Sequence, residues 1–400
     1  MNKKTARDTY RSVERHYVPE WLTNRIQITN FDLVDHMIWL LQEDGRFNEI
    51  LRVERKEIEH FKHNAPSLRN LLRTPFLMIA PTLETVEDWR CFIDETPTTL
   101  AVDELRRKMP KLKALSLSMI EHHNRIFVDL ITSVIHMSVL AAPLLGITTE
   151  LANYLVSVPP YKLRLALHRM QGLPLFRWRF NTPTFWYQFT AKTLTDEMVA
   201  HHVMQTSPIK TGEMPRGSSW SELRQPREKN EMYAYALMAY KCRASTVSSL
   251  FRLNQNAMRQ RYVEMHGISS PCGNVPTSLT WFVETPHNRL NATIFTWLYR
   301  AALAAGANGP EALIATNDVY EQLFDGAGAI SADRGCNLTR AMAADTRLAI
   351  APCRICRTHY VVSNNDTKIE MQQSFDCPAC NNQLGPKRRG SRSRVSHGQH

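Results

Sequence analysis

Four cysteines near the C-terminus have the spacing of a metal-binding site. They form two Cys-x-x-Cys pairs, Cys353 with Cys356 and Cys377 with Cys380. Two residues between the thiols let one tight turn aim both sulfurs at a single point, and two such turns complete a tetrahedral thiolate shell. Because four thiolates leave no open position for water or substrate, the pattern predicts one structural Zn²⁺ ion per chain. The alternative, two disulfides, requires an oxidising compartment.

The segment between the two cysteine pairs has the character of a β-hairpin. Residues 358–362 are rich in β-branched and aromatic side chains, residues 363–366 are turn formers, and residues 368–371 can return as a strand. We therefore expect a zinc ribbon over residues 351–386, followed by a basic disordered tail over residues 387–400. The tail can add phosphate contacts through Lys387, Arg388 and Arg389, or it can serve solubility alone.

A second candidate site is a pair of helices upstream of these cysteines. Residues 244–253 have the apolar spacing of a short helix, Asn254 can cap the next helix, and Gly267 can end it. The second helix leaves polar side chains of the kind that recognise bases and phosphates on its more exposed faces. These candidate DNA contacts are Asn256, Arg259, Gln260 and Arg261. A solvated helix face is the alternative.

The charge of the chain suits an acidic partner. Over 400 residues, 49 Lys and Arg face 38 Asp and Glu, which gives a net charge of +11. The charged N-terminus is followed by no apolar secretory segment, so we expect a cytoplasmic protein. The uncharged stretch 130–147 barely reaches spanning length and contains His136 and Pro143, which favours a buried helix over a membrane span.

No catalytic site is predicted. The sequence contains no phosphate-binding glycine loop, no paired-carboxylate metal motif and no nucleophile–base set, which argues against a nucleic-acid enzyme with a zinc accessory lobe. Two histidine doublets, 122–123 and 201–202, fall on expected helices, where most histidines are solvated or packed.

The first half of the chain contains an internal repeat. Residues 94 positions apart match at Asn30 and Asn124 and at several apolar positions that follow, and both copies end in an apolar segment, 75–78 and 174–178. The pattern is helical in both copies. We expect a pseudo-symmetric pair of helical units over residues 1–97 and 98–204, since two copies are too few for a solenoid.

The second half is expected to be helical up to the zinc ribbon. Residues 205–230 are rich in Pro, Gly and Ser and predict a linker. A helical domain over residues 231–350 follows, with helices expected at 231–241, 291–305, 319–324 and 338–348. The predicted fold class is therefore mainly α, with a C-terminal zinc ribbon.

The second half resembles FlhC, the zinc-containing subunit of the flagellar master regulator FlhDC. The resemblance covers residues 233–380 and rests on the helix pair, the Trp281-Phe282 segment, the helix containing Trp297, and the cysteine quartet in the family's order. It implies that the four cysteines are zinc ligands. Less strongly, residues 124–180 and, more degenerately, residues 30–81 resemble the FlhD subunit.

The resemblance implies a fused regulator with two FlhD-like units and one FlhC-like unit. The expected function is a DNA-binding transcriptional activator that binds double-stranded promoter DNA, recruits RNA polymerase and forms a homodimer matching the family's ratio of two D subunits per C subunit. It could control flagellar or other genes. The alternative is a scaffold or antagonist of FlhDC-type regulators that keeps the fold and does not read DNA.

Overall fold

The chain folds mainly into helices, as the sequence predicts, and the part that the structure describes also contains two small sheets. The computed structural model describes residues 15–170, 172–208, 226–273, 277–344, 347–365, 368–369 and 374–384. The predicted tail and most of the predicted linker lie outside these residues. No helix in the described part is long and apolar enough to cross a membrane. The uncharged stretch 130–147 is divided between two helices, which end at Met137 and begin at Ala141.

The first half is built from two consecutive sets of elements. The first set is α2 (Glu20–Glu43), η1 (Gly45–Phe47), α3 (Asn48–Leu51), α4 (Arg55–His63), α5 (Ala65–Leu72), β1 (Ile79–Pro81), α6 (Val86–Ile93) and α7 (Leu100–Lys108). The second set is α8 (Ala114–Met137), α9 (Ala141–Leu145), α10 (Thr149–Ser157), α11 (Pro160–Arg169), β2 (Phe176–Trp178), α12 (Pro183–Thr190) and α13 (Asp196–Gln205).

The two sets repeat element by element. Adding 94 to the bounds of α2 and α4 gives the bounds of α8 and α10, and adding 97 to those of β1 and α6 gives those of β2 and α12. The offset that the sequence indicates therefore extends over whole helices. The sets divide within residues 109–113, later than the boundary expected after residue 97, because α7 is the counterpart of α13.

Strands β1 and β2 join the two repeats about a pseudo-two-fold axis. They are antiparallel, with Ile79 opposite Trp178, Ala80 opposite Arg177 and Pro81 opposite Phe176. Each strand therefore meets its own counterpart, and the axis passes through the central pair. The exit at 174–178, which the sequence shows only as an apolar segment, thus contains β2, and β1 begins directly after the exit at 75–78.

The repeated asparagines hold these exits in place. Asn30 donates to the carbonyls of Leu72 and Phe76 and accepts from the Met78 amide at 2.8 Å. Asn124 likewise donates to the carbonyl of Leu173 and accepts from the Leu175 amide at 2.9 Å. Both asparagines are almost fully buried. Each side-chain amide therefore takes the place of water as the hydrogen-bond partner of these backbone groups.

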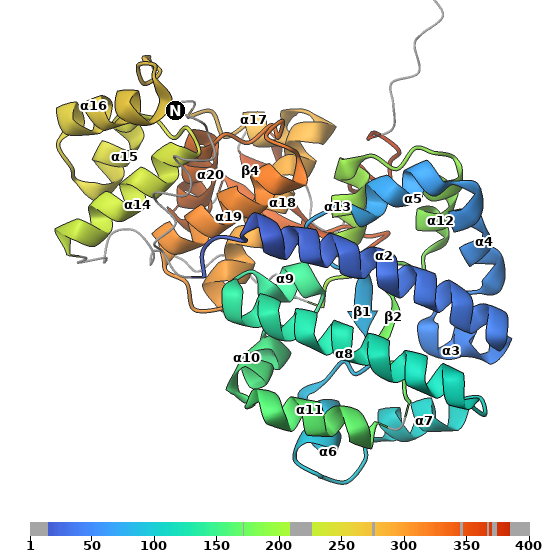
Figure 1. Cartoon of the computed structure of the whole chain (residues 1–400). Coiled ribbons are helices and arrows are strands. Elements are labelled where there is room, and N and C mark those ends of the chain that lie inside the picture. Colours follow the sequence, from blue (N-terminus) through green and yellow to red (C-terminus); the bar gives the residue numbers. More distant parts are fainter. Residues whose placement is uncertain are drawn as a thin grey trace, which may run out of the picture.

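The long helices α2 and α8 pack antiparallel against each other (Figure 1). Arg25 near the start of α2 donates to the Ser133 hydroxyl near the end of α8, and Lys113 beside the start of α8 reaches Glu43 at the end of α2. Between them, the rings of His36 and His123 stack at 3.7 Å. Burial lowers the pKa of His36 to about 3, so the pair packs in the neutral form.

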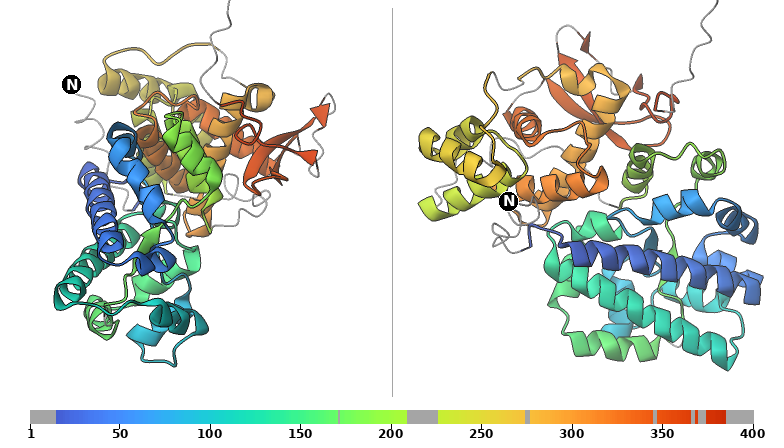
Figure 2. Two further views of the ribbon diagram at one scale, coloured as in Figure 1. Left: turned by 90° about the vertical axis from the view of Figure 1, so that its right-hand side faces the viewer. Right: turned by 45° about the horizontal axis from the view of Figure 1, so that its top comes forward.

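The second half surrounds two central helices. Its elements are α14 (Arg227–Ala239), α15 (Ala244–Phe251), α16 (Gln255–His266), α17 (Trp281–Glu284), α18 (Pro286–Ala304), α19 (Gly309–Leu323), α20 (Ala332–Ala344), β3 (Leu348–Pro352), β4 (His359–Asn365) and β5 (Lys368–Ile369). Helices α18 and α19 pack together at the centre, and the group α14–α16 projects to one side, away from the repeated helices (Figures 1 and 2).

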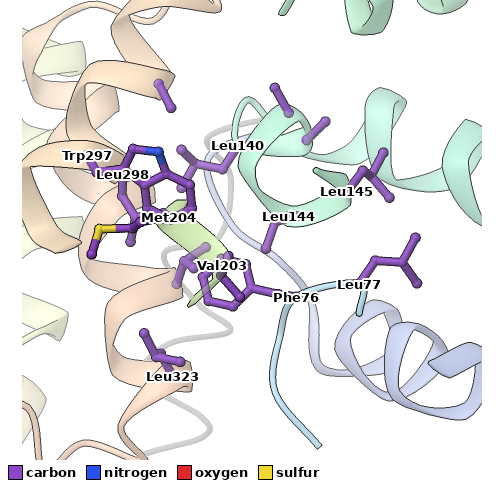
Figure 3. Packing of buried hydrophobic residues seen from close by; sticks show 14 of the residues in the cluster. Phe76, Leu77, Leu140, Leu144, Leu145, Val203, Met204, Trp297, Leu298 and Leu323 are labelled. Carbon is purple, nitrogen blue, oxygen red and sulfur yellow. The ribbon is translucent and has the colours of Figure 1, made fainter. Parts of the chain in front are cut away.

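The two halves share one apolar core. Phe76 and Leu144 of the repeats face Trp297 and Leu298 of α18 and Leu323 of α19, with Val203 and Met204 of α13 between them (Figure 3). Asp318 of α19, which is 3% exposed, accepts from the amide of Val18 and from the hydroxyl of Tyr240. The halves are therefore joined by apolar and polar contacts as well as by the linker.

Candidate metal centre and nucleic-acid interface

The four predicted cysteine ligands come together at one point. Their sulfur atoms all lie within 4.8 Å of one another, and Cys356 and Cys377 are 3.6 Å apart. A tetrahedron with Zn–S bonds of 2.3 Å has edges of about 3.8 Å. The separation is far longer than a disulfide bond of about 2.05 Å, and all eight cysteines are free. The residues present therefore fit a four-coordinate metal ion, although no ion is part of the structure.

The local backbone explains how the sulfurs converge. After β3, the chain turns so that the Cys353 amide bonds the Thr358 carbonyl and the Arg357 amide bonds the Cys353 carbonyl. In the second turn, the Asn381 amide bonds the Cys377 carbonyl. Two further amides point at sulfur: that of Cys377 lies 3.3 Å from the sulfur of Cys353, and that of Cys380 lies 3.4 Å from the sulfur of Cys377.

Without a cation, three of the clustered thiols influence one another's ionisation. The hydrogen bond from the Cys377 thiol lowers the pKa of Cys356, and the same contact raises the pKa of Cys377. Burial raises the pKa of Cys380, and the charge on Cys356 raises it further. The thiolate of Cys356 is thus stabilised, whereas ionisation of Cys377 and Cys380 is disfavoured. A bound dication reverses this opposition, because it attracts every thiolate in the cluster.

The metal lobe, defined here as residues 347–365 and 374–384, docks against both halves. In its sheet, β3 and β4 are antiparallel, with Ile350 opposite Val361. The fully buried Tyr360 of β4 is hydrogen-bonded through its hydroxyl to Nδ1 of His201 in α13 at 2.8 Å. Both histidines of the doublet 201–202 are buried, and His201 links the lobe to the second repeat.

Helices α15 and α16 form the predicted helix pair, joined by residues 252–254. The Asn254 side chain caps α16 by accepting from the Ala257 amide at 3.0 Å, and Gly267 ends the helix with φ +70°, as predicted. Met258, Tyr262 and Met265 are buried, and α16 packs against α15. This packing leaves the opposite face of α16 to the solvent.

The predicted DNA-contact residues of α16 differ in how far they are exposed to solvent. Asn256, Arg259 and Gln260 are exposed. Arg261 is only partly exposed, since its guanidinium lies over the Tyr235 ring at 5.1 Å and pairs with Glu264 at 2.8 Å. Arg261 therefore braces α16 against α14. Residues 226–273 contain seven Lys and Arg against three Glu, so the group α14–α16 is basic. Lys387, Arg388 and Arg389 lie outside the described residues.

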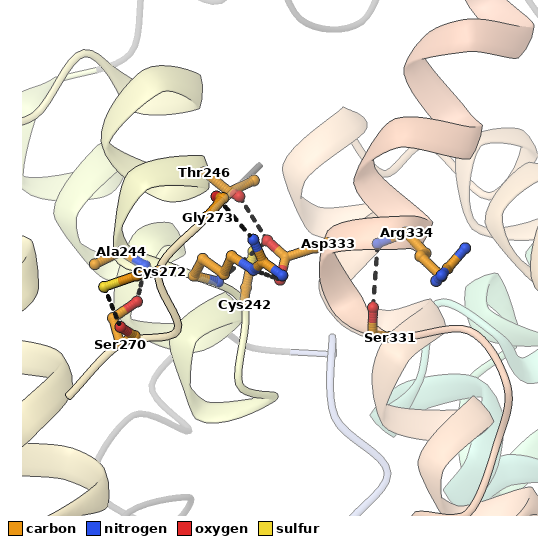
Figure 4. A network of polar contacts seen from close by, with 10 residues as sticks. Cys242, Ala244, Thr246, Ser270, Cys272, Gly273, Ser331, Asp333 and Arg334 are labelled. Atoms are coloured by element: carbon orange, nitrogen blue, oxygen red, sulfur yellow. Dashed lines mark hydrogen bonds and ion pairs between the residues drawn. The ribbon is translucent and has the colours of Figure 1, made fainter. Parts of the chain in front are cut away.

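A buried carboxylate that has no distinguishing pattern in the sequence fixes the helix pair to the rest of the second half (Figure 4). Asp333 of α20, 6% exposed, accepts from the Thr246 hydroxyl at 2.5 Å, from the Arg243 amide at 3.2 Å and from the Cys242 thiol at 3.5 Å. Its second oxygen lies 3.5 Å from Nε of Arg243. An aspartate in a helical segment has no sequence pattern that would identify this role.

Comparisons with known proteins agree with this arrangement. The family model described as the flagellar transcriptional activator FlhC matches residues 225–396, which include the helix pair and the cysteine cluster. The flagellar transcriptional regulator FlhC of Thauera aminoaromatica is 30% identical over 147 residues, which cover 36% of this chain and 71% of the relative.

The fold is that of a mainly helical protein, and its second half is similar to flagellar transcriptional regulators. The chain belongs to the FlhC family. The family match begins at residue 225, so the repeated helices of the first half lie outside it.

Proposed function

We propose that the protein is a DNA-binding transcriptional activator in which α16 enters the major groove of promoter DNA. The observation that carries the proposal is the helix pair, with a capped second helix whose polar face is exposed and whose apolar face is anchored. In a helix–turn–helix, side chains near the start of the second helix contact base edges. Asn256, Arg259 and Gln260 occupy those positions, and their amide and guanidinium groups suit adenine and guanine.

Zn²⁺ is the proposed metal of the cysteine cluster. A four-sulfur shell is typical of structural zinc, and it leaves no coordination site for a reaction. The bound ion would stabilise the metal lobe, in which Cys353, Cys356, Cys377 and Cys380 supply the four thiolates. The lobe then supports α18, because β4 packs against that helix. Helix α18 in turn packs against α19, which contacts α14.

The repeated first half is proposed to act as the FlhD partner within the same chain. Its two units are related by a pseudo-two-fold axis and share a core with the FlhC-like half, so they are presented to it in fixed geometry. A homodimer would contain four such units and two FlhC-like halves. We expect this dimer to recruit RNA polymerase, and light scattering of the full chain tests the dimer directly.

The test of DNA binding is a gel shift on the promoter of the gene neighbourhood at moderate salt. The full chain should prefer this DNA to bulk DNA, and Arg259→Ala should lower the specific affinity about ten-fold or more, since a bidentate base contact is worth ~1–3 kcal/mol. Arg107→Ala on α7 is the matched control and should leave the affinity unchanged. Equal affinity of the full chain for promoter and bulk DNA would contradict the proposal.

One observation favours the alternative, a scaffold or antagonist without DNA readout. Glu264 of α16 pairs with Arg261 and accepts from Gln260 at 3.3 Å, so a negative charge lies on the candidate recognition helix. If the alternative is correct, Arg259→Ala should leave every interaction of the protein unchanged, including any binding to an FlhDC-type regulator.

A further inference from the structure

A second polar site lies where α18 meets the metal lobe. A cavity of about 10 Å³ is lined by Thr293, Trp297 and Arg300 of α18, by Ile350 of β3 and by His359 of β4. A volume of this size holds about one water-sized group. The site uses neither the cysteine sulfurs nor any residue of α16, so it is separate from both features on which the proposed function rests.

Arg300 supplies an unbalanced positive charge to this cavity. Its side chain is deeply buried, with 8% of the residue exposed, and Nη1 has no hydrogen-bond partner. Within the described part of the chain, no carboxylate pairs with it. Burial lowers the pKa of Arg300 to about 10, which still leaves the guanidinium charged at neutral pH. A buried cation without a counter-charge is costly, so such a group is normally paired.

Two side chains at the cavity, Arg300 and Trp297, have hydrogen-bond donors without a partner. Trp297 lies one turn before Arg300, is 4% exposed, and its Nε1 also has no partner. Its ring is held in place by Phe76 of the first repeat, at 5.9 Å. The hydroxyl of Thr293 is already occupied, because it donates to the Arg289 carbonyl and accepts from the Val361 amide. A ligand that only accepts hydrogen bonds would complement this set.

We propose that Arg300 and Trp297 bind a small oxyanion, with the chemistry of a phosphate group. One oxygen would enter the cavity and accept from Nη1 of Arg300 and Nε1 of Trp297, while the rest of the anion stays toward the solvent. The anion can be free inorganic phosphate or a phosphate of bound DNA. Because the site joins α18, the metal lobe and, through Phe76, the first repeat, its occupant would stabilise all three together.

The test is a titration of the full, metal-loaded chain with inorganic phosphate against sodium chloride at matched ionic strength. Phosphate should raise the unfolding temperature of the wild-type chain in a saturable manner, since a ligand that binds only the folded state stabilises it. Arg300→Met should abolish this rise, and Arg340→Met, at an exposed arginine of α20, should preserve it. No saturable rise in the wild type, or an equal rise in Arg300→Met, would overturn the proposal.

Two further variants guard against a folding defect. Trp297→Phe keeps the ring and removes the Nε1 donor, so phosphate affinity should fall about ten-fold, the effect of losing one hydrogen bond to a charged acceptor. Arg300→Lys keeps the charge and loses the planar fork, and it should also bind more weakly. Wild-type phosphate affinity in both variants would contradict the assignment of the two donors.

The source of the phosphate is settled by DNA binding at several salt concentrations. If DNA supplies it, Arg300→Met should reduce the slope of log affinity against log salt by about 1. If the slope is unchanged while phosphate stabilisation is lost, the ligand is the free anion. The phosphate titration does not depend on DNA binding, so failure of the proposed function would leave this result intact.

Discussion

Replacing Asp333 by alanine should loosen the helix pair α15–α16 from its support. The Asp333 carboxylate is buried on α20 and accepts from the Arg243 amide, the Thr246 hydroxyl and the Cys242 thiol, all at or near the start of α15. The Arg243 side chain is its ionic partner. In Asp333→Ala, the amide and the guanidinium of Arg243 both lose a charged acceptor in a buried setting.

The expected loss is about 3 kcal/mol of unfolding free energy. A hydrogen bond to a charged group is worth ~1.5–3 kcal/mol, and breaking a buried ion pair costs ~3–5 kcal/mol. These values cannot be added, because the contacts share one carboxylate and act as a unit. The expected loss lies at the lower end of the ion-pair range, because the Arg243 side chain is 18% exposed and can recover some hydration.

Urea unfolding of the full chain measures this loss, with Asp129→Ala, an exposed aspartate of α8, as the matched control. The midpoint should fall in Asp333→Ala with an unchanged slope, and specific DNA affinity should fall more than affinity for bulk DNA, because α16 is no longer held in one orientation. If Asp333→Ala is within 0.5 kcal/mol of the control, a threshold typical of ordinary surface changes, the carboxylate does not hold the helix pair.

Three further predictions concern the repeats and the metal lobe. Asn124→Ala should lower the free energy of unfolding in urea by about 2 kcal/mol, because it removes two buried hydrogen bonds. Asn30→Ala removes three and should lower it by about 3 kcal/mol. Losses below about 0.5 kcal/mol would show that these asparagines do not hold the exits in place. The pKa of His36 is lowered to about 3 by burial, so the folded state keeps it neutral while the unfolded chain takes up a proton below about pH 6.5. The stability that the neutral His36 contributes is therefore complete above that pH, and it is lost as pH falls toward 3, by at most ~1.4 kcal/mol per pH unit. His36→Leu should flatten the pH dependence of the unfolding free energy. An unchanged slope of unfolding free energy against pH in this variant would contradict the prediction. Cys356→Ser should release the metal ion and raise hydrogen exchange in the metal lobe while α2 and α8 stay protected, and unchanged metal content would refute the ligand assignment.

The cysteine cluster is the part of the site that sequence predicts best. Two residues between paired thiols let one turn aim both sulfurs of a pair at a single point, and the structure brings the two predicted pairs, Cys353 with Cys356 and Cys377 with Cys380, together. The two ends of α16 can also be predicted from the sequence, because the Asn254 cap and Gly267 act within one turn of the helix. Strand β3, by contrast, was not predicted, since residues 348–352 adjoin a helical pattern and form a strand only by pairing with β4.

The first half shows where periodicity stops being informative. Helix α2 begins at Glu20, but its first turns expose Trp21 and Ile28 and bury the polar Thr29 and Asn30, which obscures the apolar stripe. Strands β1 and β2 have three residues each, too few to establish a period of two, and their pairing depends on the symmetry of the repeats.

Contacts between the halves could not be predicted from local pattern at all. Phe76 and Trp297 are ordinary apolar residues in the sequence, and only the fold places them in one core. The same holds for the hydrogen bond between His201 and Tyr360, which are 159 residues apart. Such pairs reflect tertiary packing, for which a single sequence contains no signal.

The central claim, that α16 reads promoter DNA, is tested most directly by the ratio of promoter to bulk DNA affinity at one salt concentration. The account predicts that the wild-type chain has a large ratio, and that Arg259→Ala lowers it about ten-fold or more while affinity for bulk DNA changes much less. A ratio near one for the wild-type chain, or the same ratio in Arg259→Ala and in the Arg107→Ala control, would contradict the claim.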